Sequence, residues 1–145
     1  MAAETAAQQA AQDMRKLAST SNPLEVIQNP IVVSVSVGVL GGYLFRKAMY
    51  KSRRDLFGVA VPPKKGVRDR VEYYYPDPKD PDKADLTKPH PQARTNRLLL
   101  NLGGVILGTL LINNTLTDDP MVDYIGLGVA AGSFANVIMA ILDID

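Results

Sequence analysis

Two segments near the end of the chain contain no charged residue in their interiors, and they restrict the fold more than any other feature. They cover residues 98–112 and 124–142 and are joined by a short acidic connection. A helix needs about 20 mainly apolar residues to cross a bilayer. Inside lipid every backbone hydrogen bond must be made within the protein. The pattern therefore predicts a membrane-embedded helical hairpin, with spans over residues 96–116 and 119–143.

A third apolar run covers residues 31–45 and follows Asn29 and Pro30, a typical helix start. The run is too short to cross a membrane alone. Two cations follow it, and their long side chains can reach the membrane surface. We therefore predict a first span over residues 30–50. A β-strand is the alternative, because valines alternate with serines, but the helix-start signal and the glycines argue against a strand.

The first 29 residues are rich in alanine and glutamine, which favour helix. Residues 1–20 lack the apolar core of a secretory signal peptide, and they contain two acids and two bases, which is a poor composition for a cleavable presequence. We expect an amphipathic surface helix over about residues 5–17. A second helix start follows at Asn22 and Pro23, with Glu25 placed to complete the cap.

The long segment 51–95 is polar, basic and rich in proline. It holds seven of the ten prolines, which exclude long helices and favour extended or polyproline structure. The sequence of residues 71–75 could form one short strand or an extended arm. In the second case Tyr73, Tyr74 and Tyr75 would dock on a partner protein; a solvated linker is the alternative.

The chain is thus expected to be an all-α integral membrane protein. Its parts would be an N-terminal amphipathic helix, a single span, a long proline-rich polar loop and a C-terminal helical hairpin. Residues 46–97 contain 14 of the 16 basic residues and seven acidic ones. Because positive loops stay on the cytoplasmic or equivalent side, we expect the loop and the C-terminus on that side, the matrix in a mitochondrion.

Each expected span carries two glycines four residues apart, a spacing that lets helix backbones approach closely. Each pair continues along its stripe into a small or polar residue. The predicted packing residues are Gly38, Gly42, Gly104, Gly108, Gly128, Gly132, Asn101 and Asn136. Counting 1.5 Å per residue from the hairpin turn places Gly108 level with Gly128 and Gly104 level with Gly132. The same count predicts a hydrogen bond between the amides of Asn101 and Asn136.

Composition argues against several classes of function. There is no cysteine and only one histidine, His90, so a structural zinc site is not expected. The spans contain no central acid or base for a proton relay. We therefore expect no enzyme activity and no metal or organic cofactor. The net charge of +1 and the mixture of acids among the bases give no reason to expect nucleic acid as a partner.

Anionic lipid is the one small-molecule partner that the sequence favours. Five cations follow the first span, and each could gain about 1 kcal/mol beside an acidic lipid surface such as one containing cardiolipin. Their alternative role is to set topology alone. These residues are Arg46, Lys47, Lys51, Arg53 and Arg54.

Close-packing spans, a long polar arm and the lack of reactive groups together indicate a role in assembly. We expect a non-catalytic accessory subunit of a large energy-transducing complex, either a respiratory complex or ATP synthase, in the mitochondrial inner membrane. Its partners would be other subunits and membrane lipid. Two alternatives are a small transporter or protein-translocase component and a thylakoid photosystem subunit.

Overall fold

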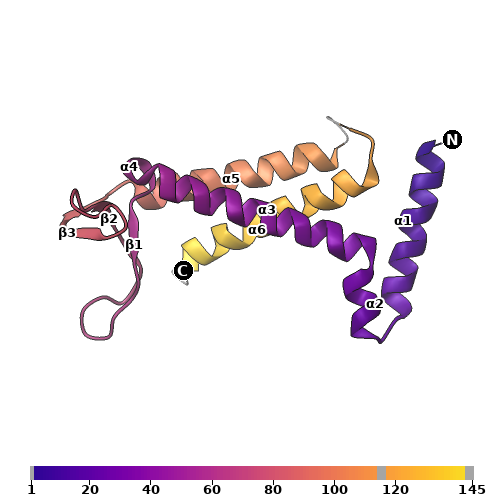
Figure 1. Cartoon of the computed structure of the whole chain (residues 1–145), viewed down its shortest axis with the longest axis horizontal. Helices are drawn as coiled ribbons and strands as arrows, with labels where there is room; N and C mark the ends of the chain where they lie inside the picture. Colours follow the sequence, from indigo (N-terminus) through magenta and orange to yellow (C-terminus); the bar gives the residue numbers. More distant parts are fainter. Residues whose placement is uncertain (1, 114–116, 143–145) are drawn as a thin grey trace. The chain divides into compact units, whose positions relative to one another are not determined.

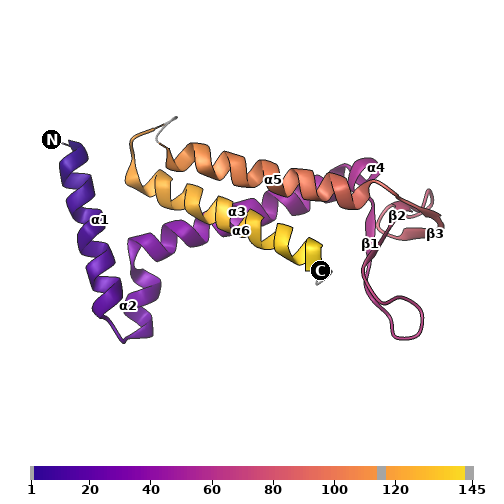
Figure 2. The same cartoon turned by 180° about the vertical axis from the view of Figure 1, so that it is seen from behind.

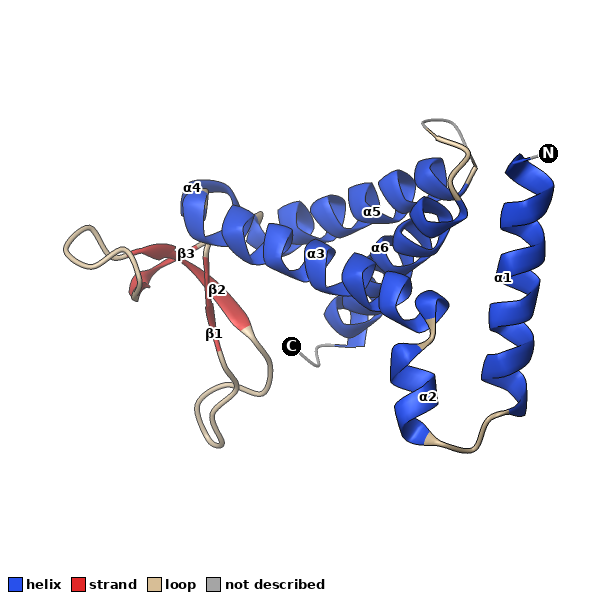
Figure 3. Cartoon of the chain, turned by 45° about the vertical axis from the view of Figure 1, so that its right-hand side comes forward, coloured by secondary structure: helices blue, strands red, loops and turns tan. Residues whose placement is uncertain are grey.

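The computed structural model describes residues 2–113 and 117–142, and helices dominate it (Figures 1 and 3). Among these described residues, strands occur only between residues 59 and 89. The elements, in chain order, are α1 (Ala2–Ser19), α2 (Pro23–Gln28), α3 (Pro30–Ser52), α4 (Arg54–Phe57), β1 (Val59–Val61), β2 (Glu72–Pro76), β3 (Ala84–Pro89), α5 (Ala93–Ile112) and α6 (Pro120–Leu142).

Three of the helices, α3, α5 and α6, are long and apolar enough to cross a membrane. They occupy the three apolar runs of the sequence. Helix α5 begins at Ala93, three residues before the predicted span, and α3 continues to Ser52. The predicted ends of the second and third spans, residues 114–116 and 143, lie outside the described residues.

The chain divides into two compact units, which are described separately. Unit 1 comprises Met1–Tyr43 and Gly104–Ser133, and unit 2 comprises Leu44–Gly103 and Phe134–Asp145. Each of the three long helices contributes one part to each unit. Unit 1 also contains α1 and α2, and unit 2 contains α4 and all three strands.

In unit 1 the helix starts follow the signals in the sequence. The side chain of Asn22 accepts a 3.0 Å hydrogen bond from the amide of Leu24 and caps α2, with Pro23 in its first turn. Asn29 has two roles. Its Oδ1 caps α3 by accepting from the Ile31 amide at 3.0 Å, and its Nδ2 donates to the carbonyl of Asp13 in α1 at 2.8 Å. One buried amide therefore fixes the start of α3 and its contact with α1.

In unit 2 the polar segment forms a three-stranded antiparallel sheet in the order β1-β2-β3, so the all-α prediction is wrong in this segment. The register pairs Val59 with Tyr74, and Pro76 with Ala84. The prolines lie where a sheet tolerates them: Pro76 at the irregularity in β2 and Pro89 at the end of β3, an edge strand. One strand was considered over residues 71–75, and the structure has it one residue later, together with two partners.

Candidate functional site

The closest helix contact in unit 1 joins α3 to α6 through Gly38 and Gly128. A Cβ atom built on Gly38 would lie 2.9 Å from the Val129 amide nitrogen, and one built on Gly128 would lie 3.0 Å from the Gly38 Cα. The Cβ on Gly38 would also clash with the carbonyl oxygen of Ile125, and the Cβ on Gly128 with that of Val35, so only glycine permits this approach of two backbones. We call this contact the α3–α6 seam.

A second close contact, the α5–α6 seam, also lies in unit 1. A Cβ atom on Gly104 would lie 2.9 Å from the Cβ of Ser133, and one on Gly108 would lie 2.7 Å from the Cβ of Ala130. From the other side, a Cβ atom on Gly126 would lie 2.6 Å from the Cβ of Leu111. Small residues on both helices therefore set this separation.

The two seams correct the predicted glycine pairing. Gly128 faces α3 and not Gly108, and Gly132 lies near Val39, with its built Cβ 3.6 Å from the Val39 Cα. Depth along the helix axis was the basis of the prediction, and depth does not fix rotation about the axis. Residues two apart lie about 200° apart around a helix. Gly126 and Gly128 therefore serve opposite faces of α6.

Three residues of the α5–α6 seam were missed at the sequence level. Gly126, Ala130 and Ser133 follow a spacing of four and then three residues, which places them on one face of α6. This stripe of small residues could have been recognised in the sequence, next to the predicted pair Gly128 and Gly132. Gly42, which was predicted to pack, is half-buried in α3.

Asn101, in unit 2, does not form the predicted bond with Asn136. Its Nδ2 donates to the hydroxyl of Tyr50 at 3.1 Å and to the carbonyl of Arg97 at 2.8 Å. Its Oδ1 has no hydrogen-bond partner among the described residues, although the side chain is only 4% exposed. The buried amide therefore joins α5 to the end of α3 and not to α6.

The most developed polar site in unit 2 surrounds Arg97 of α5. Its guanidinium lies over two rings, 4.2 Å from the centroid of Tyr50 and 4.6 Å from that of Tyr73. Its Nε donates to the carbonyl of Phe57 at 2.7 Å, and a terminal nitrogen donates to that of Gly58 at 3.1 Å. We call these five residues the Arg97 anchor. It connects α3, α4, β2 and α5 through one side chain.

Two more side chains complete the attachment of α4. The ring of His90 lies with Nε2 2.7 Å from the carbonyl oxygen of Asp55, and Asn96 Nδ2 donates to the carbonyl of Leu56 at 2.7 Å. Together with Arg97, they contact four consecutive carbonyls, from residue 55 to residue 58. The last carbonyls of a helix lack partners within it. In this protein the missing hydrogen-bond partners are the side chains of His90, just before α5, and of Asn96 and Arg97 in its first two turns.

The three adjacent tyrosines are used within unit 2. Tyr73 belongs to the Arg97 anchor, and the ring of Tyr75 stacks on His90 with centroids 4.3 Å apart. Tyr74 donates its hydroxyl to the carboxylate of Glu72, and this hydrogen bond raises the pKa of Tyr74. Tyr75 remains 39% exposed. Docking of these tyrosines on a partner protein stays a prediction.

The five cations predicted to meet lipid headgroups differ in their surroundings. Arg46 is buried at 6% exposure, whereas Lys47 and Lys51 are exposed on α3. Arg53 pairs with Asp55 at 3.0 Å and Arg54 with Asp82 at 2.8 Å. The hydrogen bond from Arg53 lowers the pKa of Asp55. Contact of these cations with lipid headgroups stays a prediction.

Neither the side-chain geometry nor similarity to other proteins assigns a reaction to this chain. Within residues 2–113 and 117–142, no group of three histidine, aspartate or glutamate side chains is placed to hold a metal ion. No protein-family model, curated protein or solved structure matches the chain. The functional interpretation therefore depends on the seams, the Arg97 anchor and the exposed apolar surface.

Proposed function

We propose that the protein is a non-catalytic structural subunit of a large membrane complex, inserted through α3, α5 and α6. The observation that carries this proposal is the use of two opposite faces of α6. Gly128 meets α3, and the stripe of Gly126, Ala130 and Ser133 meets α5. Because lipid gives helices no hydrophobic reason to associate, close contact between small residues is a main source of attraction in a membrane.

The outward faces of the same helices support the membrane assignment. Large apolar side chains remain exposed on all three, including Phe45 at 59%, Ile106 at 62% and Ile141 at 65%. A soluble protein rarely leaves contiguous apolar surface of this kind in water. Lipid or the helices of neighbouring subunits would cover it.

The proposed host is an energy-transducing complex, a respiratory complex or ATP synthase, in the mitochondrial inner membrane. Three features support this host: the close-packing spans, the polar segment held by the Arg97 anchor, and the lack of an acid or base in the middle of the spans. The seams argue against the transporter alternative. Backbone and small side chains fill the space beside Gly38, Gly104, Gly108 and Gly128, so these glycines do not line an open path.

The proposed topology places the sheet and the C-terminus on the positively charged side of the membrane, the matrix side in a mitochondrion. The turn at Lys64 and Lys65 is exposed and suits trypsin. In sealed vesicles of known orientation, trypsin should cut there only from the matrix side. Cleavage only from the opposite side would reverse the topology.

Native gel electrophoresis followed by mass spectrometry tests the proposed function. After mild detergent extraction, an epitope-tagged chain should comigrate with one large complex in a fixed ratio to its other subunits. A Gly128→Leu variant should leave this band, because a leucine would meet the backbone of α3. The control Gly41→Leu should remain, since a Cβ atom at Gly41 has no atom within 4 Å. Migration of the wild-type chain alone would favour a transporter.

A further inference from the structure

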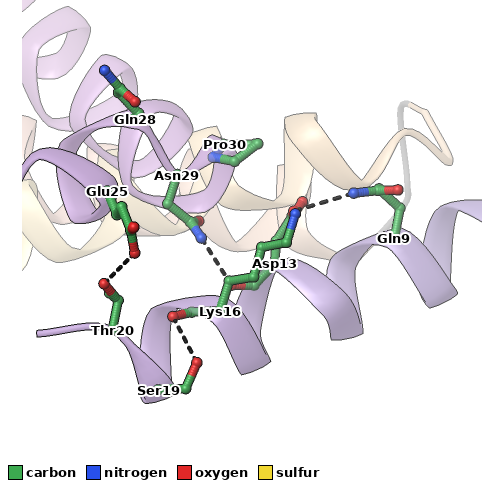
Figure 4. Close-up of a pocket in the computed structure, with 9 residues that line it drawn as sticks. All are labelled: Gln9, Asp13, Lys16, Ser19, Thr20, Glu25, Gln28, Asn29 and Pro30. Atoms are coloured by element: carbon green, nitrogen blue, oxygen red, sulfur yellow. Dashed lines mark hydrogen bonds between the residues drawn. The ribbon is translucent and has the colours of Figure 1, made fainter. Parts of the chain in front are cut away.

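A polar groove of about 630 Å³ lies in unit 1 between α1, α2 and the start of α3 (Figure 4). Its volume is within the range of about 300–1,000 Å³ typical of ligand sites. It contains two carboxylates, one ammonium group and three side-chain amides. The lining residues are Gln9, Asp13, Lys16, Ser19, Thr20, Glu25, Gln28, Asn29 and Pro30.

The carboxylate of Asp13 is the unusual group in this groove. The residue is only 6% exposed, and its one recorded side-chain hydrogen bond comes from Gln9 Nε2 at 3.2 Å. Glu25, on the facing helix, accepts a 2.5 Å hydrogen bond from the hydroxyl of Thr20. A buried carboxylate is costly unless several donors or a cation meet it. Asp13 therefore lacks the charged partner that its burial favours.

Lys16, one turn further along α1, does not supply that partner. In the part of the chain that the structure describes, neither Lys16 nor Asp13 forms an ion pair, and the Lys16 residue is exposed. The groove thus offers a buried negative group and an exposed positive group that does not pair with it. This arrangement fits a ligand that carries both charges.

The place of the groove in the fold indicates which ligand that is. Pro30 is both a lining residue and the first residue of α3, a helix able to cross a membrane. In a membrane the groove would lie at the level of the lipid headgroups. Apolar side chains of α2 remain exposed beside it, Leu24 at 61% and Ile27 at 60%, and can contact the upper part of acyl chains.

We propose that this groove binds the headgroup of a phosphatidylethanolamine lipid. The primary ammonium group would donate hydrogen bonds to Asp13 and Glu25, and the phosphate would meet Lys16. A choline headgroup carries a similar charge but has no N–H donor, so it cannot satisfy the buried carboxylate. An anionic headgroup would face two carboxylates and one lysine. This inference rests on the membrane insertion proposed above.

Native mass spectrometry of the delipidated full-length protein in detergent tests the proposal. Phosphatidylethanolamine, phosphatidylcholine and phosphatidylglycerol with identical acyl chains would be titrated separately. The first should bind most tightly. Asp13→Asn should weaken its binding about tenfold, the effect of losing one charge-assisted hydrogen bond. It should leave the weak binding of phosphatidylcholine unchanged. The matched control Asp118→Asn changes an exposed acid outside the groove and should have no effect.

Two further variants keep the proposal testable if Asp13→Asn fails to fold, because Asp13 is buried. Glu25→Gln alters an exposed residue and should also weaken phosphatidylethanolamine binding. Lys16→Gln should weaken binding of both zwitterionic lipids, whereas Arg15→Gln, an exposed cation outside the groove, should not. Glycerophosphoethanolamine, which has the headgroup without acyl chains, should compete only weakly. Tight binding of this soluble compound would overturn the assignment to a lipid.

Equal affinity for the ethanolamine and choline lipids would overturn the proposal, as would a preference for phosphatidylglycerol. So would unchanged phosphatidylethanolamine binding in both Asp13→Asn and Glu25→Gln. These results are separable from a failure of the proposed function. A protein that stays in the membrane and in its complex but shows no ethanolamine preference contradicts the lipid site alone.

Discussion

The guanidinium carbon of Arg97 lies 4.2 Å from the centre of the Tyr50 ring, and this contact joins two helices that are distant in the sequence. Arg97 is in the second turn of α5, and Tyr50 is near the end of α3. The same guanidinium carbon lies 4.6 Å from the centre of the Tyr73 ring in β2. One cation therefore contacts β2 and the two helices α3 and α5. Figure 2 shows these three elements from behind.

Replacing Arg97 by lysine should loosen this attachment although the charge is kept. Lysine lacks the planar fork that donates to the carbonyls of Phe57 and Gly58 while stacking on the rings. Loss of hydrogen bonds to a charged donor should destabilise unit 2 by about 1.5–3 kcal/mol. Hydrogen–deuterium exchange of the amides in β1 and β2 should accelerate. Arg53→Lys, at an exposed ion pair, is the control; equal protection in both variants would contradict the anchoring role.

The two seams predict opposite effects for neighbouring glycines. Gly38→Ala should destabilise the protein by about 1–3 kcal/mol, the usual cost of overpacking, since its Cβ would meet the backbone of α6. Gly41→Ala should be neutral or stabilising by up to about 1 kcal/mol, because alanine favours helix and a Cβ atom there has no atom within 4 Å.

The same comparison applies to Gly104→Ala against Gly103→Ala in α5. Thermal unfolding in detergent micelles would measure all four changes. Equal destabilisation within each pair would contradict the close backbone packing at the two seams. In α6, Gly128→Ala should be more harmful than Gly132→Ala, whose built Cβ makes only ordinary contacts.

A third pair of glycines tests the connection between α4 and β1. Gly58 has φ +62° and ψ −178°, a region nearly restricted to glycine. A Cβ there would also lie 3.1 Å from the Cβ of Ala93. Gly58→Ala should cost about 1–3 kcal/mol and expose the sheet to proteolysis. Gly66 also has positive φ, +81°, but lies in an open turn, so Gly66→Ala should cost less. A larger effect at Gly66 would contradict this account of the connection.

The sequence predicted the long helices well and the contacts between them poorly, for physical reasons. Apolar length and charge position act locally, so residues such as Asn29 and Pro30 mark the start of α3 directly. The face of α6 that meets each neighbour depends on the rotation of α6 about its axis. That rotation is set by packing against α3 and α5 at the same time. The pair Gly126 and Ala130 and the pair Gly128 and Gly132 both allow close packing, and nothing in the sequence says which pair faces α5.

The sheet was missed for a related reason. Strand β1 has three residues, and β3 carries Asp85 and Lys88 beside a terminal proline, so neither has a strong local preference for extended structure. Hydrogen bonding to β2 holds both segments in the extended conformation that their own sequences do not favour. The Arg97 anchor was hidden as well, because Arg97 appeared to be a topology-setting cation. Its partners Tyr50 and Tyr73 lie more than 20 residues away along the chain.

Alkaline carbonate extraction tests the central claim most directly, namely that α3, α5 and α6 cross a membrane. The treatment releases peripheral proteins but leaves chains whose apolar helices are surrounded by lipid. We expect the full-length protein to remain in the membrane pellet at high pH, together with a known multi-span protein as a control. Recovery of the protein in the supernatant, with the control still in the pellet, would contradict insertion and the functional proposal built on it.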